Sequence, residues 1–182
     1  IALYKIQELN KIDIESESIK IGACVSLTKL EKFIEEHVPE FKSLIHIFAS
    51  PQIKNQGTLI GNALNASPIG DTIPFLLVSE AVVAIASKQD GTRFVPLSKF
   101  YLGYRQVDLN PNEIVPHIHI PIPKKENILK LYKVSVRKDL DISAVTFAAL
   151  LTLGDDNKIS SLHLAFGGIA ATVLRMTEIE QF

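Results

Sequence analysis

The sequence predicts an α+β fold in two parts: an α/β core over residues 1–122 and an antiparallel α+β subdomain over residues 123–182. Three observations support this prediction. Strand patterns alternate with amphipathic helix patterns through the first part. The stretch 121–127 combines two prolines with two lysines, which is typical of a boundary. Beyond it, the apolar residues form three long strand-like runs.

Apolar spacing and capping residues predict the helices of the first part. Ser26 or Thr28 can cap a helix that follows, and Thr28 with Glu31 fits a capping box. Residues 41–48 place apolar side chains at i, i+3, i+4 and i+7, so they predict a second amphipathic helix. Asp71 or Thr72 would cap a third, short helix. Strands are expected at residues 19–23, 81–87, 93–95, 118–122, 129–136, 144–153 and 159–166.

Composition excludes several classes of protein. Nineteen Lys and Arg against 20 Asp and Glu give a net charge of −1, so no basic field favours nucleic acid. The apolar stretches are too short or too interrupted to span a membrane. The single cysteine, Cys24, cannot build a Cys-ligated iron–sulfur or zinc site. We therefore expect a cytoplasmic protein. Because the chain opens with Ile1 rather than Met, we expect a fragment.

The stretch 53–71 is the most informative for function, because three glycines lie there among three asparagines, a Thr, a Ser and an Asp. Glycine lets backbone N–H groups approach a ligand closely, and the amides and hydroxyls add directed hydrogen bonds. This composition describes a polar loop able to hold a large cofactor. It matches neither a P-loop nor a dinucleotide fingerprint. An ordinary loop whose Gly and Asn residues supply turns is the alternative.

Four stretches in order resemble the FAD-binding domain of the xanthine dehydrogenase and molybdenum hydroxylase family. They are residues 53–71, 102–106, 133–143 and 165–172. The resemblance implies the second half of a PCMH-type FAD-binding core, followed by a subdomain like that of carbon monoxide dehydrogenase flavoproteins. The family's Gly-rich pyrophosphate loop and the end of its last subdomain have no counterpart, so we expect truncation at both ends. Ile60 stands where relatives carry Gly, and its β-branched side chain resists positive φ.

The resemblance also implies the residues that contact the cofactor. Thr58 to Asn62 would wrap the FAD, Asp71 would be a polar partner, and Phe48 would lie beside the flavin ring. Without the resemblance, Phe48 is a core residue of its helix, Val115 packs in a strand, and Lys133 lies on a solvated face. The expected cofactor-binding residues are Phe48, Thr58, Leu59, Ile60, Gly61, Asn62, Asp71, Val115 and Lys133. No catalytic acid, base or nucleophile is expected.

By resemblance, the role is electron transfer. A molybdopterin centre would oxidise a purine, iron–sulfur clusters would carry the electrons to FAD, and NAD would accept them. The molybdopterin and the clusters would lie in partner domains or subunits of a hetero-oligomer. Two alternatives stay open: the FAD subunit of a carbon monoxide dehydrogenase-like or other molybdenum hydroxylase, and a non-catalytic module that has lost FAD.

Two further pairs of residues could carry chemistry. His117 and His119 lie on one face of a strand and could ligate a metal, although no third ligand is evident and a solvated face is favoured. Asp139 with Asp141 could form an acid–base pair. The cations nearby favour a surface turn held by local charge pairs instead.

Overall fold

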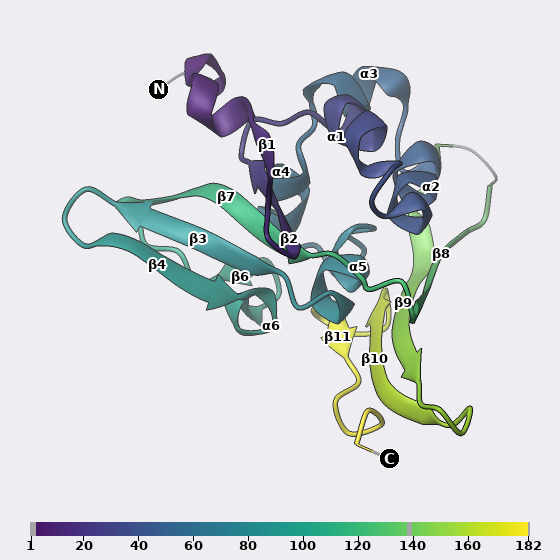
Figure 1. Ribbon diagram of the computed structural model, residues 1–182. Coiled ribbons are helices and arrows are strands. Elements are labelled where there is room, and N and C mark those ends of the chain that lie inside the picture. The colour runs from purple at the N-terminus through teal and green to yellow at the C-terminus, as the bar shows by residue number, and fades with distance from the viewer. Residues whose placement is uncertain (1–2, 138–139, 182) are drawn as a thin grey trace.

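The computed structural model describes residues 3–137 and 140–181 and confirms the predicted α+β class (Figure 1). The first part contains a five-stranded sheet in the order β1-β2-β7-β3-β4. Its strands are Ile12–Glu15, Ser18–Gly22, Glu113–Pro121, Val82–Ser87 and Gly91–Pro96. Every pair of neighbours in this sheet is antiparallel. The alternation of helices and strands was thus predicted correctly, but it does not produce the parallel pairing of a doubly wound core.

The helices cluster beside this sheet and between it and the second part (Figure 1). They are α1 Leu27–Ile34, α2 Pro39–Ile47, α3 Pro51–Gln56, α4 Leu59–Leu64, α5 Ile73–Val78 and α6 Leu97–Phe100. Two short 3-10 helices, η1 Leu3–Lys5 and η2 Gln7–Asn10, precede β1. Strands β5 Tyr101–Gly103 and β6 Gln106–Val107 form a small ribbon after α6.

The predicted capping box at the first helix is wrong. Ser26 is the N-cap of α1, and its hydroxyl accepts a hydrogen bond from Lys29 N at 3.2 Å. Thr28 lies inside the helix and donates its hydroxyl to Asn55 Oδ1. The sequence allowed both residues as caps, and the earlier start lets Leu27 be buried on the apolar face of the helix.

The prediction of a polar loop at 53–71 is also wrong in its geometry. Much of the stretch is helical, because Ser50 caps α3 and Thr58 caps α4 through hydrogen bonds to Ile53 N and Gly61 N. Ile60 lies within α4, so its backbone is helical and a β-branched side chain is compatible with it. The short helices fold back on the core instead of leaving the Gly and Asn residues in an extended loop.

The second part is a four-stranded antiparallel sheet in the order β11-β10-β9-β8. Its strands are β8 Asn127–Ser135, β9 Ser143–Leu153, β10 Ile159–Gly167 and β11 Leu174–Arg175. Helix α5 packs against β9 and β10 and also belongs to the core of the first part. It therefore joins the two sheets, as its central place in Figure 1 shows.

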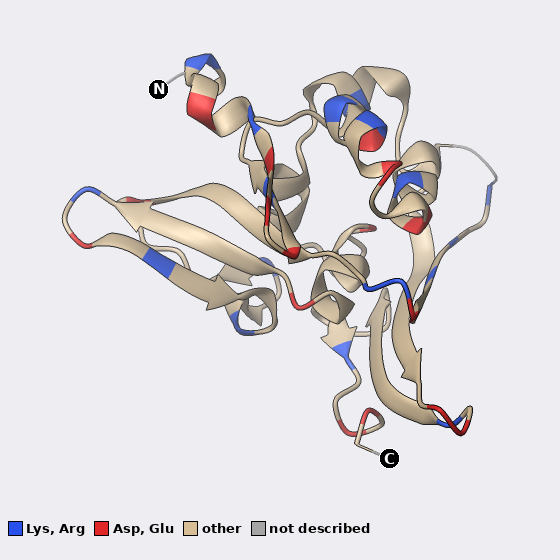
Figure 2. Cartoon of the chain, viewed as in Figure 1, with Lys and Arg blue, Asp and Glu red and all other residues tan. Residues whose placement is uncertain are grey.

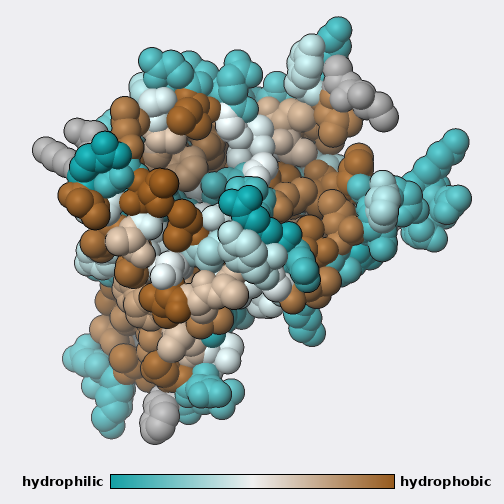
Figure 3. Space-filling view, turned by 180° about the vertical axis from the view of Figure 1, so that it is seen from behind, coloured by the Kyte–Doolittle hydropathy of each residue, from teal (hydrophilic) through white to brown (hydrophobic). Residues whose placement is uncertain are grey.

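The surface carries charges of both signs, interspersed along the chain (Figure 2). No helix in the described ranges is long and apolar enough to cross a membrane. Apolar side chains gather over the C-terminal sheet when the molecule is seen from behind (Figure 3). Tyr132, Phe147 and Phe166 form an aromatic row across three strands of this sheet, with ring centroids 6.1 and 4.8 Å apart.

Candidate functional site

A cavity of about 260 Å³ lies where the two parts meet. Its walls come from the end of α2 and the start of α3, the segment before α5, the strands β8 and β9, and residues 140–142 just before β9. The lining residues are Ile47, Phe48, Ala49, Ser50, Ile53, Ile69, Asp71, Lys133, Leu140, Asp141, Ile142 and Ser143. Three of the nine predicted cofactor-binding residues, Phe48, Asp71 and Lys133, therefore converge on one cavity.

A buried polar triad forms one side of this cavity. Lys133 Nζ donates to Asp71 Oδ2 at 2.9 Å and to Ser143 Oγ at 2.6 Å, and the Ser143 hydroxyl donates to Asp71 Oδ1. The side chains of Lys133 and Asp71 are only 7% and 9% exposed. The expectation that Lys133, taken alone, lies on a solvated face is wrong, because the carboxylate of Asp71 offsets the cost of burying its charge. Sequence reasoning missed Ser143.

The triad keeps hydrogen-bonding capacity for a ligand. An ammonium has three N–H groups, and Lys133 uses two of them within the triad. A carboxylate offers about four lone-pair sites, and Asp71 accepts at two. Counting the residues that the structure describes, one donor and two acceptor sites therefore stay available beside a wall that is otherwise largely apolar.

Phe48 is the C-cap residue of α2, and its half-buried ring packs against the core while it also lines the cavity. Lys54, which is 6% exposed, holds this helix end in place. Its ammonium donates to the carbonyl oxygens of Ile45 and His46, each at 3.3 Å, and to Glu31 Oε2 at 2.8 Å. Sequence reasoning missed this role of Lys54, because a lysine in a polar stretch gives no sign of burial.

The residues predicted to wrap the FAD do not line this cavity. Thr58 lines a separate depression with Asn55, Gln56 and residues near α1. Leu59, Ile60 and Val115 have buried side chains that pack in the core. A cofactor would reach these three only through their backbone or after a rearrangement.

Gly61 and Asn62 lie on α4, and Asn62 links that helix to the cavity. Its Oδ1 accepts a hydrogen bond from Thr72 Oγ1 at 2.6 Å, and Thr72 directly follows Asp71. Thr58 is the N-cap of α4, and Asn62 lies four residues further along, inside the helix. The helix extends from the depression at Thr58 toward the buried triad.

The histidine pair gains no support as a metal site. The rings of His117 and His119 are 4.9 Å apart, and partial burial lowers the pKa of each. Within residues 3–137 and 140–181, no three His, Cys, Asp or Glu side chains are grouped to hold a metal ion. His117 and His119 are half-buried and not on the predicted solvated face, since Phe94 packs beside both imidazole rings.

The proposed carboxylate pair cannot be compared in full, because Asp139 lies outside the described residues. Asp141 accepts hydrogen bonds from the backbone and the side chain of Arg137, at 2.7 and 3.0 Å. These bonds lower the pKa of the Asp141 carboxyl. Asp141 is thus held by a local charge pair, as the surface-turn interpretation predicted.

Two protein families match the chain. The family described as "FAD binding domain in molybdopterin dehydrogenase" matches residues 1–123, and "CO dehydrogenase flavoprotein C-terminal domain" matches residues 130–182. The chain therefore belongs to the FAD-binding domains of molybdopterin dehydrogenases, a family of oxidoreductases.

Curated relatives extend the match to particular enzymes. Xanthine dehydrogenase of Blastobotrys adeninivorans is 35% identical, over 86% of this chain and 12% of its own length. The xanthine dehydrogenase FAD-binding subunit of Escherichia coli O157:H7 is 33% identical, over 98% of this chain and 62% of its own length. The chain thus spans less than two thirds of these relatives.

Solved structures show the same fold. A Cu,Mo-CO dehydrogenase chain in its cyanide-inactivated form superposes with a TM-score of 0.88 at 26% identity, covering 97% of this chain and 61% of that one. The reconstituted CO dehydrogenase from Oligotropha carboxidovorans superposes with a TM-score of 0.87 at 26% identity, covering 96% of this chain and 60% of that one. The resemblance to the molybdenum hydroxylase family is confirmed.

The residues of the cavity fit part of a flavin. Pockets that enclose a drug-sized ligand measure about 300–1,000 Å³, so about 260 Å³ suits a ring system and not a whole dinucleotide. The apolar surface for such a ring comes from Phe48, Ile53, Ile69 and Ile142. The donor and acceptors for its polar edge come from the triad of Lys133, Asp71 and Ser143.

Proposed function

We propose that this chain is the electron-transfer module of a xanthine dehydrogenase-type molybdenum hydroxylase. It would take electrons from iron–sulfur clusters onto FAD and pass them to NAD. The observation that carries the proposal is the convergence of Phe48, Asp71 and Lys133 on one cavity between the two parts of the fold. The xanthine dehydrogenases among the relatives favour this enzyme over other members of the family.

The chain's own residues would act by binding and orienting the cofactor. Bound FAD supplies the redox chemistry of its ring, which the protein positions and tunes. Phe48 would pack on the ring, and the third N–H of Lys133 would donate to an acceptor at its edge. Asp71 would accept from a ring N–H or a hydroxyl. The apolar side chains around them would exclude water and strengthen these contacts.

The remaining predicted residues form a second group that we assign to the rest of the cofactor. Thr58, Gly61 and Asn62 would contact it along α4. Leu59, Ile60 and Val115, whose side chains are buried, would contribute through backbone atoms or by supporting this helix. We also propose that the division near residue 122 separates the FAD-binding core from the flavoprotein subdomain.

Partners and location follow from the same proposal. Molybdopterin and iron–sulfur clusters would be carried by partner domains or subunits, because the one cysteine of this chain cannot ligate a cluster. Purine catabolism in the cytoplasm would be the setting. The interspersed charges visible in Figure 2 give no reason to expect nucleic acid as a partner.

A steady-state assay of the assembled enzyme tests this function. The enzyme is supplied with xanthine and NAD, and in parallel with carbon monoxide and with aromatic heterocycles. The proposal is supported if NAD is reduced with xanthine as substrate and not with carbon monoxide or the heterocycles. Turnover of carbon monoxide or a heterocycle without xanthine oxidation would assign the chain to another molybdenum hydroxylase. That alternative has structural support, since the solved relatives include CO dehydrogenase.

A further inference from the structure

We call the cavity lined by Phe48, Asp71 and Lys133 the flavin cavity. A second cavity, of about 360 Å³, lies at the opposite end of α5 from it. Asp71 precedes α5 and lines the flavin cavity, whereas Ser79 and Glu80 follow α5 and line this one. Its other walls come from the segment joining the two parts and from β8, β9 and β10. The lining residues are Glu17, Val78, Ser79, Glu80, Pro121, Ile122, Pro123, Lys124, Glu126, Asn127, Leu150, Thr152, Ser161 and His163.

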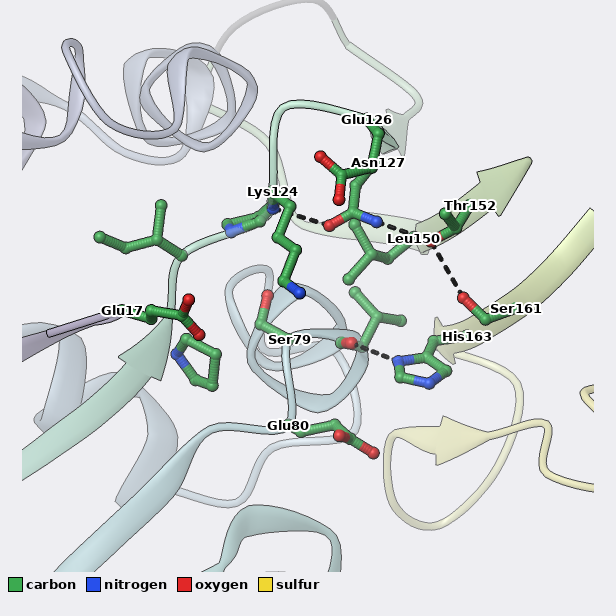
Figure 4. A pocket seen from close by; sticks show the side chains of 14 residues that line it. Glu17, Ser79, Glu80, Lys124, Glu126, Asn127, Leu150, Thr152, Ser161 and His163 are labelled. Atoms are coloured by element: carbon green, nitrogen blue, oxygen red, sulfur yellow. Dashed lines mark hydrogen bonds between the residues drawn. The ribbon is translucent and has the colours of Figure 1, made fainter. Parts of the chain in front are cut away.

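One hydroxyl in this cavity lacks a partner. Ser79 is 4% exposed, and its Oγ makes no hydrogen bond to any described residue. Buried polar groups are nearly always paired, so an orphaned hydroxyl in a cavity wall points to a ligand that supplies the bond. Figure 4 shows this hydroxyl and the ammonium of Lys124 turned toward each other across the cavity. Two such donors suit a carboxylate.

The neighbouring polar wall is already satisfied. Asn127 accepts from Lys124 N at 2.7 Å and donates to Thr152 Oγ1 at 2.6 Å, and Ser161 Oγ donates to the same Thr152 oxygen. His163 Nδ1 lies 2.8 Å from the carbonyl oxygen of Val78. These contacts fix the shape of the cavity and leave Ser79 as the group in need of a partner.

Acidic groups also line the cavity: Glu126 comes from the same segment as Lys124, and Glu17 and Glu80 come from other segments. Glu80 is paired with Arg175 at 3.1 Å, so its charge is compensated. Glu17 lines the cavity from the turn between β1 and β2, and its carboxylate faces inward in Figure 4. A simple anion would be repelled here. A ligand with both charges could place its carboxylate on Lys124 and Ser79 and its ammonium on Glu17, so that each charged group has a partner of opposite charge or a donor.

The rest of the lining is aliphatic, from Val78, Ile122 and Leu150 together with two prolines. We propose that this cavity binds a small α-amino acid with a short aliphatic side chain. The carboxylate accepts from Ser79 Oγ and Lys124 Nζ, the ammonium donates to Glu17, and the side chain packs on Ile122 and Leu150. This site is separate from the flavin cavity and does not depend on the proposed function.

Three matched probes test the charge pattern on the full chain by isothermal titration calorimetry. L-valine carries both charges, isovalerate lacks the ammonium, and isobutylamine lacks the carboxylate. L-valine is expected to bind with a Kd of about 1 mM, and the other two at least about tenfold more weakly. Equal binding of all three probes, or no binding of valine up to about 10 mM, would overturn the proposal.

Variants then test the assigned residues. Ser79→Ala and Lys124→Gln are each expected to weaken valine binding about tenfold, while Lys125→Gln, next in the chain and not in the lining, leaves it unchanged. Glu17→Gln is expected to remove the preference for valine over isovalerate. Because Ser79 Oγ has no partner to lose, Ser79→Ala should not lower the melting temperature without ligand. A lower melting temperature, or equal weakening by Lys125→Gln, would contradict the assignment.

Discussion

The ion pair between Lys133 and Asp71 offers a sharp test of how the two parts of the fold are joined. Lys133 lies on β8 in the second part, and Asp71 lies before α5 in the first. Their charged atoms are 2.9 Å apart, and both side chains are less than a tenth exposed. Lys133→Met removes the ammonium and keeps most of the apolar stem. It leaves the Asp71 carboxylate buried with the Ser143 hydroxyl as its one side-chain partner among the described residues.

The expected loss follows from that burial. Removing one member of a buried pair costs about 3–5 kcal/mol, because the remaining charge has lost its compensation. An exposed ion pair contributes only about 0–1 kcal/mol. For a chain of this size, a loss of 3–5 kcal/mol lowers the melting temperature by about 6–20 °C.

Urea denaturation followed by circular dichroism measures the free energy of unfolding. Lys130→Met is the matched control, because Lys130 is exposed on the same strand, and it should change that energy by less than about 0.5 kcal/mol. The double variant Lys133→Met with Asp71→Leu should recover much of the loss, since an apolar pair often replaces a buried ion pair without cost. A loss of under about 1 kcal/mol in Lys133→Met would refute the claim that this pair links the two parts.

Three other predictions follow from single residues. Phe48→Ala should weaken FAD binding about tenfold, as measured by flavin fluorescence, because it removes a ring from the cavity wall; unchanged affinity would separate Phe48 from the flavin. Thr58→Ala should lower the free energy of unfolding by about 1 kcal/mol through loss of the α4 cap, and no change would contradict that capping role. A hydrogen bond from Arg93 lowers the pKa of Glu113 from 4.5 to about 2. The stability that Glu113 contributes is therefore complete above pH 4.5 and is lost as the pH falls toward 2. Melting temperatures between pH 5 and 2 should fall less steeply in Glu113→Gln than in the parent chain, and parallel curves would count against this account.

The sequence predicted strands better than it predicted the Gly- and Asn-rich segment. Residues 144–153 and 159–166 form long apolar runs separated by a Gly-Asp-Asp-Asn turn, and they appear as β9 and β10 with nearly the same bounds. In 53–71, glycines and asparagines suggested a loop, because they supply turns and glycine lets backbone N–H groups approach a ligand. Capping by Ser50 and Thr58, and burial of Leu59 and Ile60, outweighed that tendency over two short helices.

The site was predictable only in part, for a physical reason. Phe48, Asp71 and Lys133 are far apart in the sequence, and only the resemblance to a family indicated that they meet. Ser143 was missed because a serine at the start of a strand carries no sign of burial. Its position on β9 brings it within hydrogen-bonding distance of both charged members of the triad. Long-range contacts of this kind depend on tertiary packing.

Identification of the cofactor in the purified protein tests the central claim most directly. The full chain is expressed, its visible absorption spectrum is recorded, and any cofactor released on denaturation is identified by mass. We predict flavin absorption bands in the native protein and FAD in the released fraction. A colourless protein that also fails to take up added FAD would contradict the claim and favour a module of this fold that has lost its cofactor.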